Sequence, residues 1–199
     1  MGSENLIKFI TNFGDEAVIL PLIFVTTILF SVAGWIRGAL VWFFGVSLTV
    51  GCIILVKMFG LLWAEWYGGY GRSFSLSGHV AAITVVYGSL LHIFIFSRFR
   101  SWLIAALPPI VIAVILSYTR LYLMAHTLAE VVAGTSLGVI GAVVTERFTP
   151  ESPDGLMRWC MPVILMVMFI FHGYVLEAEP ALQRIFHVSY LSINQVIGW

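Results

Sequence analysis

The chain has 199 residues, of which 60% are hydrophobic and 10% are charged, and its mean hydropathy is +1.01. Soluble globular chains carry about 25% charged residues, so this composition excludes an ordinary soluble domain. The ten basic residues balance the ten acidic ones, and a net charge of zero argues against a nucleic acid as a partner. The composition therefore predicts a single integral membrane domain over residues 1–199.

Apolar runs long enough to cross about 30 Å of hydrocarbon recur along the chain and predict six membrane-spanning helices. The expected spans are residues 17–33, 39–56, 79–96, 102–118, 127–145 and 158–176. Residues 4–14 form a short amphipathic pattern that is typical of a helix lying in the membrane interface. The tail, residues 177–199, is expected to lie on the membrane surface. The predicted fold is an all-α polytopic bundle with short interfacial helices at both termini.

Two cysteines, Cys52 and Cys160, lie inside apolar runs, where they are typical of small packing residues. They form neither a disulfide framework nor a metal motif. The first residues lack the basic segment and the cleavage site of a removable signal peptide. No carboxylate cluster in the sequence resembles a magnesium site. We therefore expect no metal and no cofactor.

A short polar segment, Ser75-Leu76-Ser77-Gly78-His79, precedes the third expected span. Ser77 is a favourable helix N-cap, and Gly78 lets a ligand approach the backbone closely. The unpaired N–H groups and the positive dipole end of a helix N-terminus suit a phosphate group. His79, in the first turn, is placed to transfer a proton to or from a group bound there. For this segment alone, a loop with an interfacial histidine is the alternative interpretation.

A second polar segment runs from Thr119 to Glu130 and lies on the same membrane side, because two spans separate the segments. His126 and Glu130 are four residues apart, so on a helix they share a face. A carboxylate that accepts from one imidazole nitrogen fixes the tautomer and leaves the other nitrogen free to attack. Glu130 needs a partner, because an unpaired carboxylate at the start of an apolar span is costly. Arg120 lies about 240° around a helix from His126, so a bend or loop must bring them together.

Each of these residues also has an ordinary interpretation: a snorkelling arginine, an interfacial histidine and a hydrogen-bonded glutamate. The coincidence of two such segments on one membrane side favours a functional site.

The two segments resemble the motifs of the type-2 phosphatidic acid phosphatase family, which are K-x6-R-P, P-S-G-H and S-R-x5-H-x3-D. Leu76-Ser77-Gly78-His79 matches the second motif with one substitution. Thr119-Arg120-x5-His126-x3-Glu130 keeps both spacings of the third motif. Lys57 opens the first motif, but Ala64 and Glu65 stand where the family has arginine and proline.

The resemblance covers residues 57–130 and implies a role for each matching side chain. His126 would attack phosphorus and form a phosphohistidine, Glu130 would orient it, and His79 would protonate the leaving oxygen. The residues expected to bind the phosphate are Lys57, Arg72, Ser77, Gly78 and Arg120. Among them, Arg72 is the candidate for the cation that the first motif lacks. Such chemistry depends on positioning and charge stabilisation, which cations and helix-end amides provide without a metal.

The sequence thus predicts a membrane lipid phosphatase that removes a terminal phosphate from a lipid phosphate or pyrophosphate. Isoprenoid pyrophosphate, phosphatidic acid, phosphatidylglycerol phosphate and a lipid A phosphate are all admissible substrates. One alternative is a phosphotransferase that passes the phosphoryl group to another lipid. Another is a non-catalytic relative that binds or transports lipids. The expected partners are the lipid bilayer and a membrane lipid phosphate, and the sequence leaves the oligomeric state open.

The distribution of basic residues bears on the orientation of the domain. On the side of the two polar segments these are Lys8, Lys57, Arg72, Arg120 and Arg184. On the other side they are Arg37, Arg98, Arg100, Arg147 and Arg158. If three of the first group bind phosphate, the remaining balance is two against five, and the positive-inside rule places the second group in the cytoplasm. This predicts an active site on the extracytoplasmic side of a bacterial inner (plasma) membrane.

Overall fold

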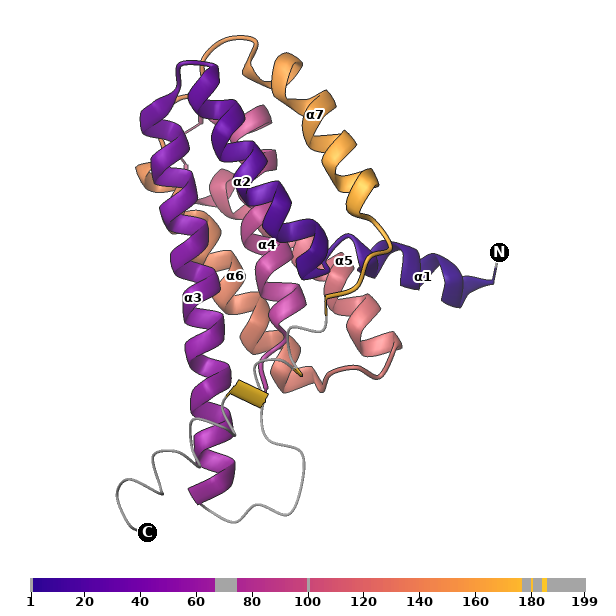
Figure 1. Cartoon of the computed structure of the whole chain (residues 1–199). Coiled ribbons are helices and arrows are strands. Elements are labelled where there is room, and N and C mark those ends of the chain that lie inside the picture. Colours follow the sequence, from indigo (N-terminus) through magenta and orange to yellow (C-terminus); the bar gives the residue numbers. More distant parts are fainter. Residues whose placement is uncertain (1, 67–74, 100, 177–179, 181–183, 186–199) are drawn as a thin grey trace.

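The computed structural model describes residues 2–66, 75–99, 101–176, 180, 184 and 185, apart from the side chains of Ser3 and Glu65. All elements in these residues are helical (Figure 1). They are α1 (Ser3–Asn12), α2 (Glu16–Val32), α3 (Ile36–Trp66), α4 (Gly78–Leu91), the π-helix η1 (His92–Phe96), α5 (Trp102–Tyr122), α6 (Leu128–Phe148) and α7 (Leu156–Phe171). The predicted all-α class is confirmed.

Five segments have the length and hydropathy of membrane spans, and α7 is a shorter apolar helix of 16 residues. The five are Glu4–Val32, Ile36–Ala64, Gly78–Phe96, Trp102–Tyr122 and Leu128–Phe148. This arrangement is that of an integral membrane protein. The sixth expected span, 158–176, ends earlier than predicted, because α7 stops at Phe171 and Gly173 adopts a left-handed conformation with φ +91°.

α1 and α2 are separate helices, as the amphipathic pattern of residues 4–14 predicts. α1 ends at Asn12, and α2 begins after Asp15, whose side chain accepts a hydrogen bond from the Ala17 N–H at 3.0 Å. α1 therefore leaves the bundle at an angle and points outward (Figure 1). The turn between the two helices lies beside the start of α4, and this position becomes important for the site.

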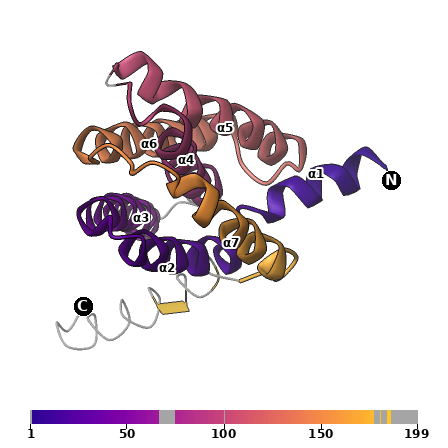
Figure 2. The same cartoon turned by 90° about the horizontal axis from the view of Figure 1, so that it is seen from above.

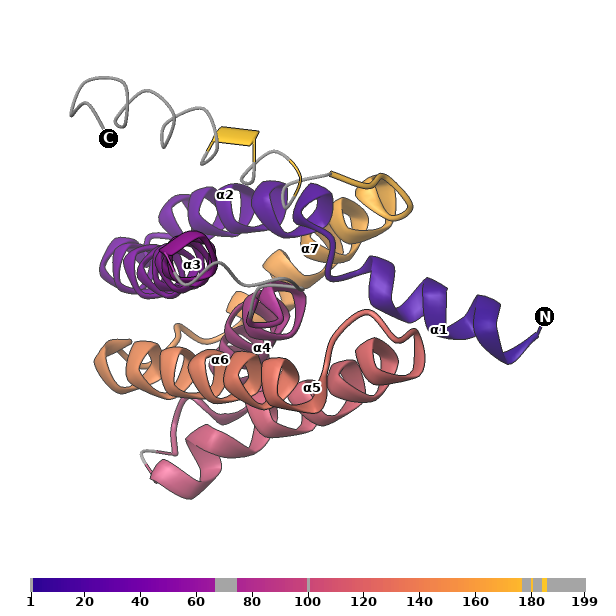
Figure 3. The ribbon, with the colours of Figure 1, turned by 90° about the horizontal axis from the view of Figure 1, so that it is seen from below.

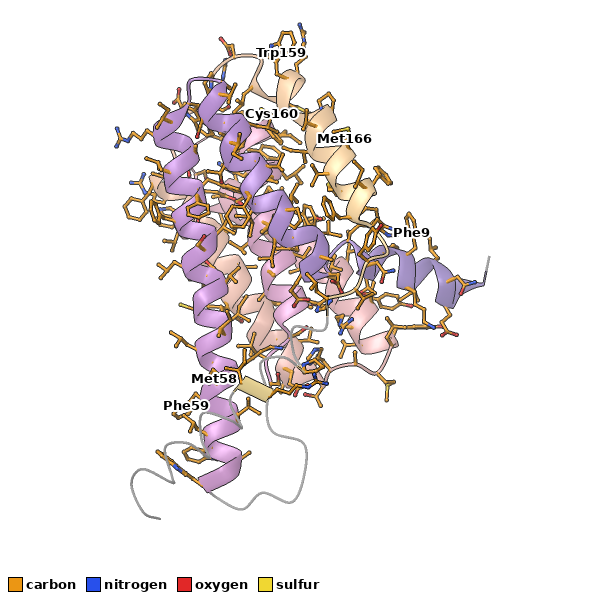
Figure 4. All side chains as sticks on the ribbon, viewed as in Figure 1. Phe9, Met58, Phe59, Trp159, Cys160 and Met166 are labelled. Atoms are coloured by element: carbon orange, nitrogen blue, oxygen red, sulfur yellow. The ribbon has the colours of Figure 1, made fainter. Side chains whose placement is uncertain are left out.

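The prediction that α3 ends near residue 56 and gives way to an interfacial loop is wrong. α3 continues to Trp66, and its 31 residues extend over about 46 Å, which exceeds the hydrocarbon thickness. The helix continues because residues 58–64 are apolar apart from Gly60 and contain no proline. Its lower part projects past the other helices, and Phe59 lies exposed on this part (Figure 4). Lys57 is therefore held on a helix rather than on a loop.

α4 lies at the centre of the bundle, with α2 and α3 on one side and α5 and α6 on the other (Figure 2). Trp42 of α3 is fully buried and donates from Nε1 to Ser89 Oγ of α4 at 2.8 Å. α4 and α6 approach each other closely at two glycines. A Cβ atom at Gly134 or Gly138 would lie 2.5 or 2.7 Å from a carbonyl oxygen of α4 or its N-cap. These contacts confirm that the glycines of α6 permit close helix packing.

A buried histidine–glutamate pair lies at the end of the bundle opposite the two polar segments. His92 Nδ1 is 3.3 Å from Glu146 Oε2, and the side chains are 8% and 1% exposed. Glu146 follows Glu130 on the same helix by 16 residues, a separation of about 24 Å. This second pair provides matched controls for substitutions in the candidate site.

Candidate active site

Three helix termini meet at one end of the bundle, which Figure 3 shows from below: the start of α4, the end of α5 and the start of α6. His79 of α4 interacts electrostatically with Lys57, Arg120 and His126. The structure thus brings together both histidines and two of the cations that the sequence singled out, although 69 residues separate Lys57 from His126.

His126 and Glu130 form the pair that their spacing predicts. His126 Nδ1 lies 3.2 Å from Glu130 Oε2, and the two side chains are 5% and 3% exposed. α6 begins at Leu128, two residues after His126, with Thr127 as its N-cap and Glu130 completing a capping box. The Thr127 N–H donates to Glu130 Oε2 at 2.8 Å, so a backbone group fixes the carboxylate oxygen that faces His126. This geometry directs Nδ1 of His126 toward the carboxylate.

Glu130 also joins the two polar segments, which the sequence did not predict. The Ser75 N–H donates to Glu130 Oε1 at 3.2 Å, and the Ser77 N–H donates to the Glu130 carbonyl oxygen at 3.0 Å. One residue therefore fixes the entry to α4 and the orientation of His126 together.

The start of α4 combines several features that suit an anion. Ser77 is the N-cap, as predicted, but its hydroxyl makes no capping hydrogen bond. This hydroxyl is fully buried and has no hydrogen-bond partner within the described part of the chain. The Lys57 side chain lies against Gly78, where a Cβ atom would be 3.4 Å from Nζ. An ammonium group and a helix N-terminus are both positive, so an anion between them would stabilise both.

Arg120 reaches the site because the chain turns back between α5 and α6. α5 ends at Tyr122, and Met124 adopts a left-handed conformation with φ +53°, which reverses the chain before His126. The predicted loop between Arg120 and His126 is therefore confirmed. Arg120 Nη1 donates to Thr11 Oγ1 of α1 at 3.4 Å. Helix α1 thus helps to hold the guanidinium group.

Asp15 is a site residue that sequence reasoning missed. Its Oδ2 lies 3.9 Å from Nε2 of His79, and its Oδ1 accepts from the N–H groups of Ala17 and Leu176. Each of the two histidines therefore has a carboxylate beside it. Ligand atoms of Asp15, Glu16 and His79 also lie within 4.8 Å of one another. No local motif reveals this contact, because 64 residues separate Asp15 from His79.

The first motif is the least complete part of the site. Lys57 occupies the expected place, whereas Ala64 and Glu65 replace the arginine and proline of the family pattern. Arg72, the candidate replacement, lies outside the residues that the structure describes. Its contribution to phosphate binding therefore stays a prediction.

The chain is thus an integral membrane protein that carries two histidines, a carboxylate beside each of them and two cations at one end of its bundle. A profile of the PAP2 superfamily matches residues 54–154, about half of the chain. The chain belongs to the PAP2 superfamily, whose members are phosphatases that act on phosphate esters. It is also similar to an "Uncharacterized 22.5 kDa protein in cps region" of Klebsiella pneumoniae, with 24% identity over 178 residues that cover 81% of each chain. No solved structure matches the chain.

Proposed function

We propose that the protein removes the terminal phosphate from a membrane lipid phosphate or pyrophosphate through a phosphohistidine intermediate. The observation that carries this proposal is the buried His126–Glu130 pair, which lies among the positive groups that surround His79. A histidine oriented by a carboxylate is a nucleophile, and nearby cations stabilise the charge on a transferring phosphoryl group.

The first step begins with attack of His126 Nε2 on phosphorus. The bond between phosphorus and the leaving oxygen breaks as the nitrogen–phosphorus bond forms, and Glu130 stabilises the positive imidazole that results. Lys57, Arg120, the Ser77 hydroxyl and the N–H groups at the start of α4 hold the phosphoryl oxygens. Phosphoryl transfer depends mainly on such positioning and charge stabilisation.

His79 supplies the proton that the leaving oxygen needs. Nε2 of His79 lies 3.9 Å from Asp15 Oδ2, so this carboxylate orients the imidazole that delivers the proton. A bound phosphate would offset the positive charges of Lys57 and Arg120 beside His79. In the second step, water attacks the phosphohistidine, its proton passes to His79, and phosphate leaves from His126.

The position of the site supports a lipid substrate. The site lies at the ends of membrane-spanning helices, where a phosphate group can reach it while its hydrocarbon chain stays in the bilayer. The proposed hydrolase differs from a lipid-to-lipid phosphotransferase only in the acceptor. A non-catalytic lipid-binding protein would not require the Glu130 carboxylate to orient an imidazole.

Phosphate release from purified protein tests the proposal directly. We expect inorganic phosphate from at least one member of a panel containing phosphatidic acid, phosphatidylglycerol phosphate, isoprenoid pyrophosphate and a lipid A phosphate. Release should persist in excess EDTA, because the proposed steps use only side chains and backbone groups. Activity that EDTA removes and magnesium restores would contradict the metal-independent steps and direct attention to Asp15, Glu16 and His79. Loss of phosphate from one lipid with equal gain by another would identify a phosphotransferase.

We further propose that the site faces the extracytoplasmic side of a bacterial inner membrane. The support is the charge balance that remains after Lys57, Arg72 and Arg120 are assigned to phosphate binding. In a variant without Cys52 and Cys160, we expect Trp66→Cys to react with a membrane-impermeant thiol reagent in intact cells. Arg98→Cys, at the opposite end of the bundle, should react only after the membrane is permeabilised. The reverse pattern would place the site in the cytoplasm.

A further inference from the structure

An apolar cleft opens between α5 and α7, and α4 forms its floor. Its volume is about 290 Å³. α7 packs along α2, whereas α5 packs along α4 and α6, so the two helices that border the cleft are not packed together. Figures 2 and 3 agree that α5 and α7 are separated on the side where α1 leaves the bundle. The cleft is therefore a feature of the face that meets the lipid.

The walls of the cleft continue the helix faces that carry two candidate site residues. On α4, Ile83 and Tyr87 line the cleft, and they follow His79 by four and eight residues. On α5, Leu116 lines the cleft and precedes Arg120 by four residues. Residues four apart lie on one face of a helix. The catalytic groups proposed above thus lie at the polar end of the same apolar surface.

The interfacial helix α1 borders the cleft at this polar end. Ile10 and Phe13 contribute to the lining, and Thr11, between them, accepts from Arg120. The Tyr87 hydroxyl donates to the Phe13 carbonyl oxygen at 2.8 Å, which satisfies the polar atom of this side chain. The other lining residues are isoleucine, leucine, methionine and phenylalanine. The cleft therefore suits a hydrocarbon and offers nothing to a polar ligand.

We propose that this cleft binds one hydrocarbon chain of the lipid whose phosphate occupies the site. The inference rests on the proposed function and adds to it the residues that recognise the chain. The lining on α4 and η1 runs from Ile83 to Phe94, about 17 Å, which is close to the thickness of one leaflet. A hydrocarbon chain in the cleft extends from the interface toward the middle of the bilayer. A lipid chain in the surrounding bilayer has the same direction.

The hydrocarbon chain of the substrate enters the cleft from lipid rather than from water, so its binding gains little hydrophobic free energy. The benefit is positional, because a seated chain holds the phosphate in line with His126. A substrate with a long chain should therefore react faster than one whose chains end near the mouth of the cleft. Filling the deep part of the cleft should remove this advantage.

Met161 and Met166 of α7 provide a matched pair of variants. Met161 lines the cleft toward the end of the bundle opposite the site. Met166 lies on the outer side of the same helix, 54% exposed (Figure 4). We expect Met161→Trp to lower kcat/KM for dihexadecanoyl phosphatidic acid about tenfold, and for dihexanoyl phosphatidic acid by less than about twofold. Met166→Trp should leave both values unchanged.

Activity toward the short-chain substrate also shows that Met161→Trp is folded. Equal losses on both substrates, or no loss on either, would overturn the assignment of the cleft to the chain. A wild-type protein that releases phosphate from neither substrate, nor from the lipid panel above, would instead overturn the proposed function, and the role of the cleft with it.

Discussion

His126→Ala is expected to lower kcat by roughly a thousandfold or more, the equivalent of about 4 kcal/mol of transition-state stabilisation. Alanine removes the nitrogen proposed to attack phosphorus, whereas His79 is proposed to act as the proton donor. The measurement is phosphate release by purified protein in detergent on the best substrate of the panel. Trapping with a radiolabelled phosphate substrate should give an acid-labile, base-stable phosphoprotein in the wild type and none in the variant.

The matched control for this variant is His92→Ala. His92 is a buried histidine beside a glutamate, as His126 is, but it lies at the other end of the bundle. Both variants remove an imidazole from a protein interior, so both have a similar cost in stability. We expect His92→Ala to retain most of its kcat when folded. Substantial turnover by His126→Ala would mean that another group is the nucleophile.

Glu130→Gln is expected to lower kcat more than about tenfold, with a smaller change in KM, because the charge acts mainly in the transition state. The carboxylate accepts from His126 and from the N–H groups of Thr127 and Ser75 through its two oxygens. An amide has one acceptor oxygen, so one donor would face the NH₂ group, and the imidazole could be held in the wrong tautomer.

Two further variants define what Glu130 contributes. Glu130→Asp should also lose activity, although it restores the residue of the family motif, because the shorter side chain withdraws the carboxylate from the imidazole. Glu146→Gln is the matched control, since Glu146 lies on the same helix beside His92. Steady-state kinetics should show nearly normal kcat for this control. A fully active Glu130→Gln would show that Glu130 has only a structural role.

The membrane-spanning helices were predictable, because hydropathy alone decides which segments can cross the bilayer. The pairing of His126 with Glu130 was also predictable from their spacing, although His126 precedes α6 and the pair forms across the N-cap Thr127. The extent of α3 was not. Aromatic residues and glycines after Lys57 are typical of an interfacial loop, but the helix continues through Trp66 past the thickness of the bilayer. In this region the chain stays helical although its composition is typical of a loop.

The contacts that complete the site depend on packing between distant segments. Asp15 approaches His79 only because the turn between α1 and α2 packs beside the start of α4. Glu130 binds the Ser75 N–H only because α4 and α6 are neighbours. Such contacts leave no periodic signal in a single sequence. The two motifs therefore predict which residues meet, and the packing of the helices determines how they are held.

The close approach of α4 and α6 has a consequence for how the site tolerates change. A Cβ atom at Gly134 or Gly138 would lie only 2.5 or 2.7 Å from a backbone carbonyl oxygen at Ser77 or Ala81, so these glycines set how closely α6 approaches α4. They thereby affect the spacing between His79, at the start of α4, and His126, just before α6. A Cβ atom at Gly134 or Gly138 would push α4 and α6 apart. Catalysis is sensitive to displacements of about 1 Å. The distance between His79 and His126, the proposed proton donor and nucleophile, thus depends on two glycines to which no catalytic role is assigned.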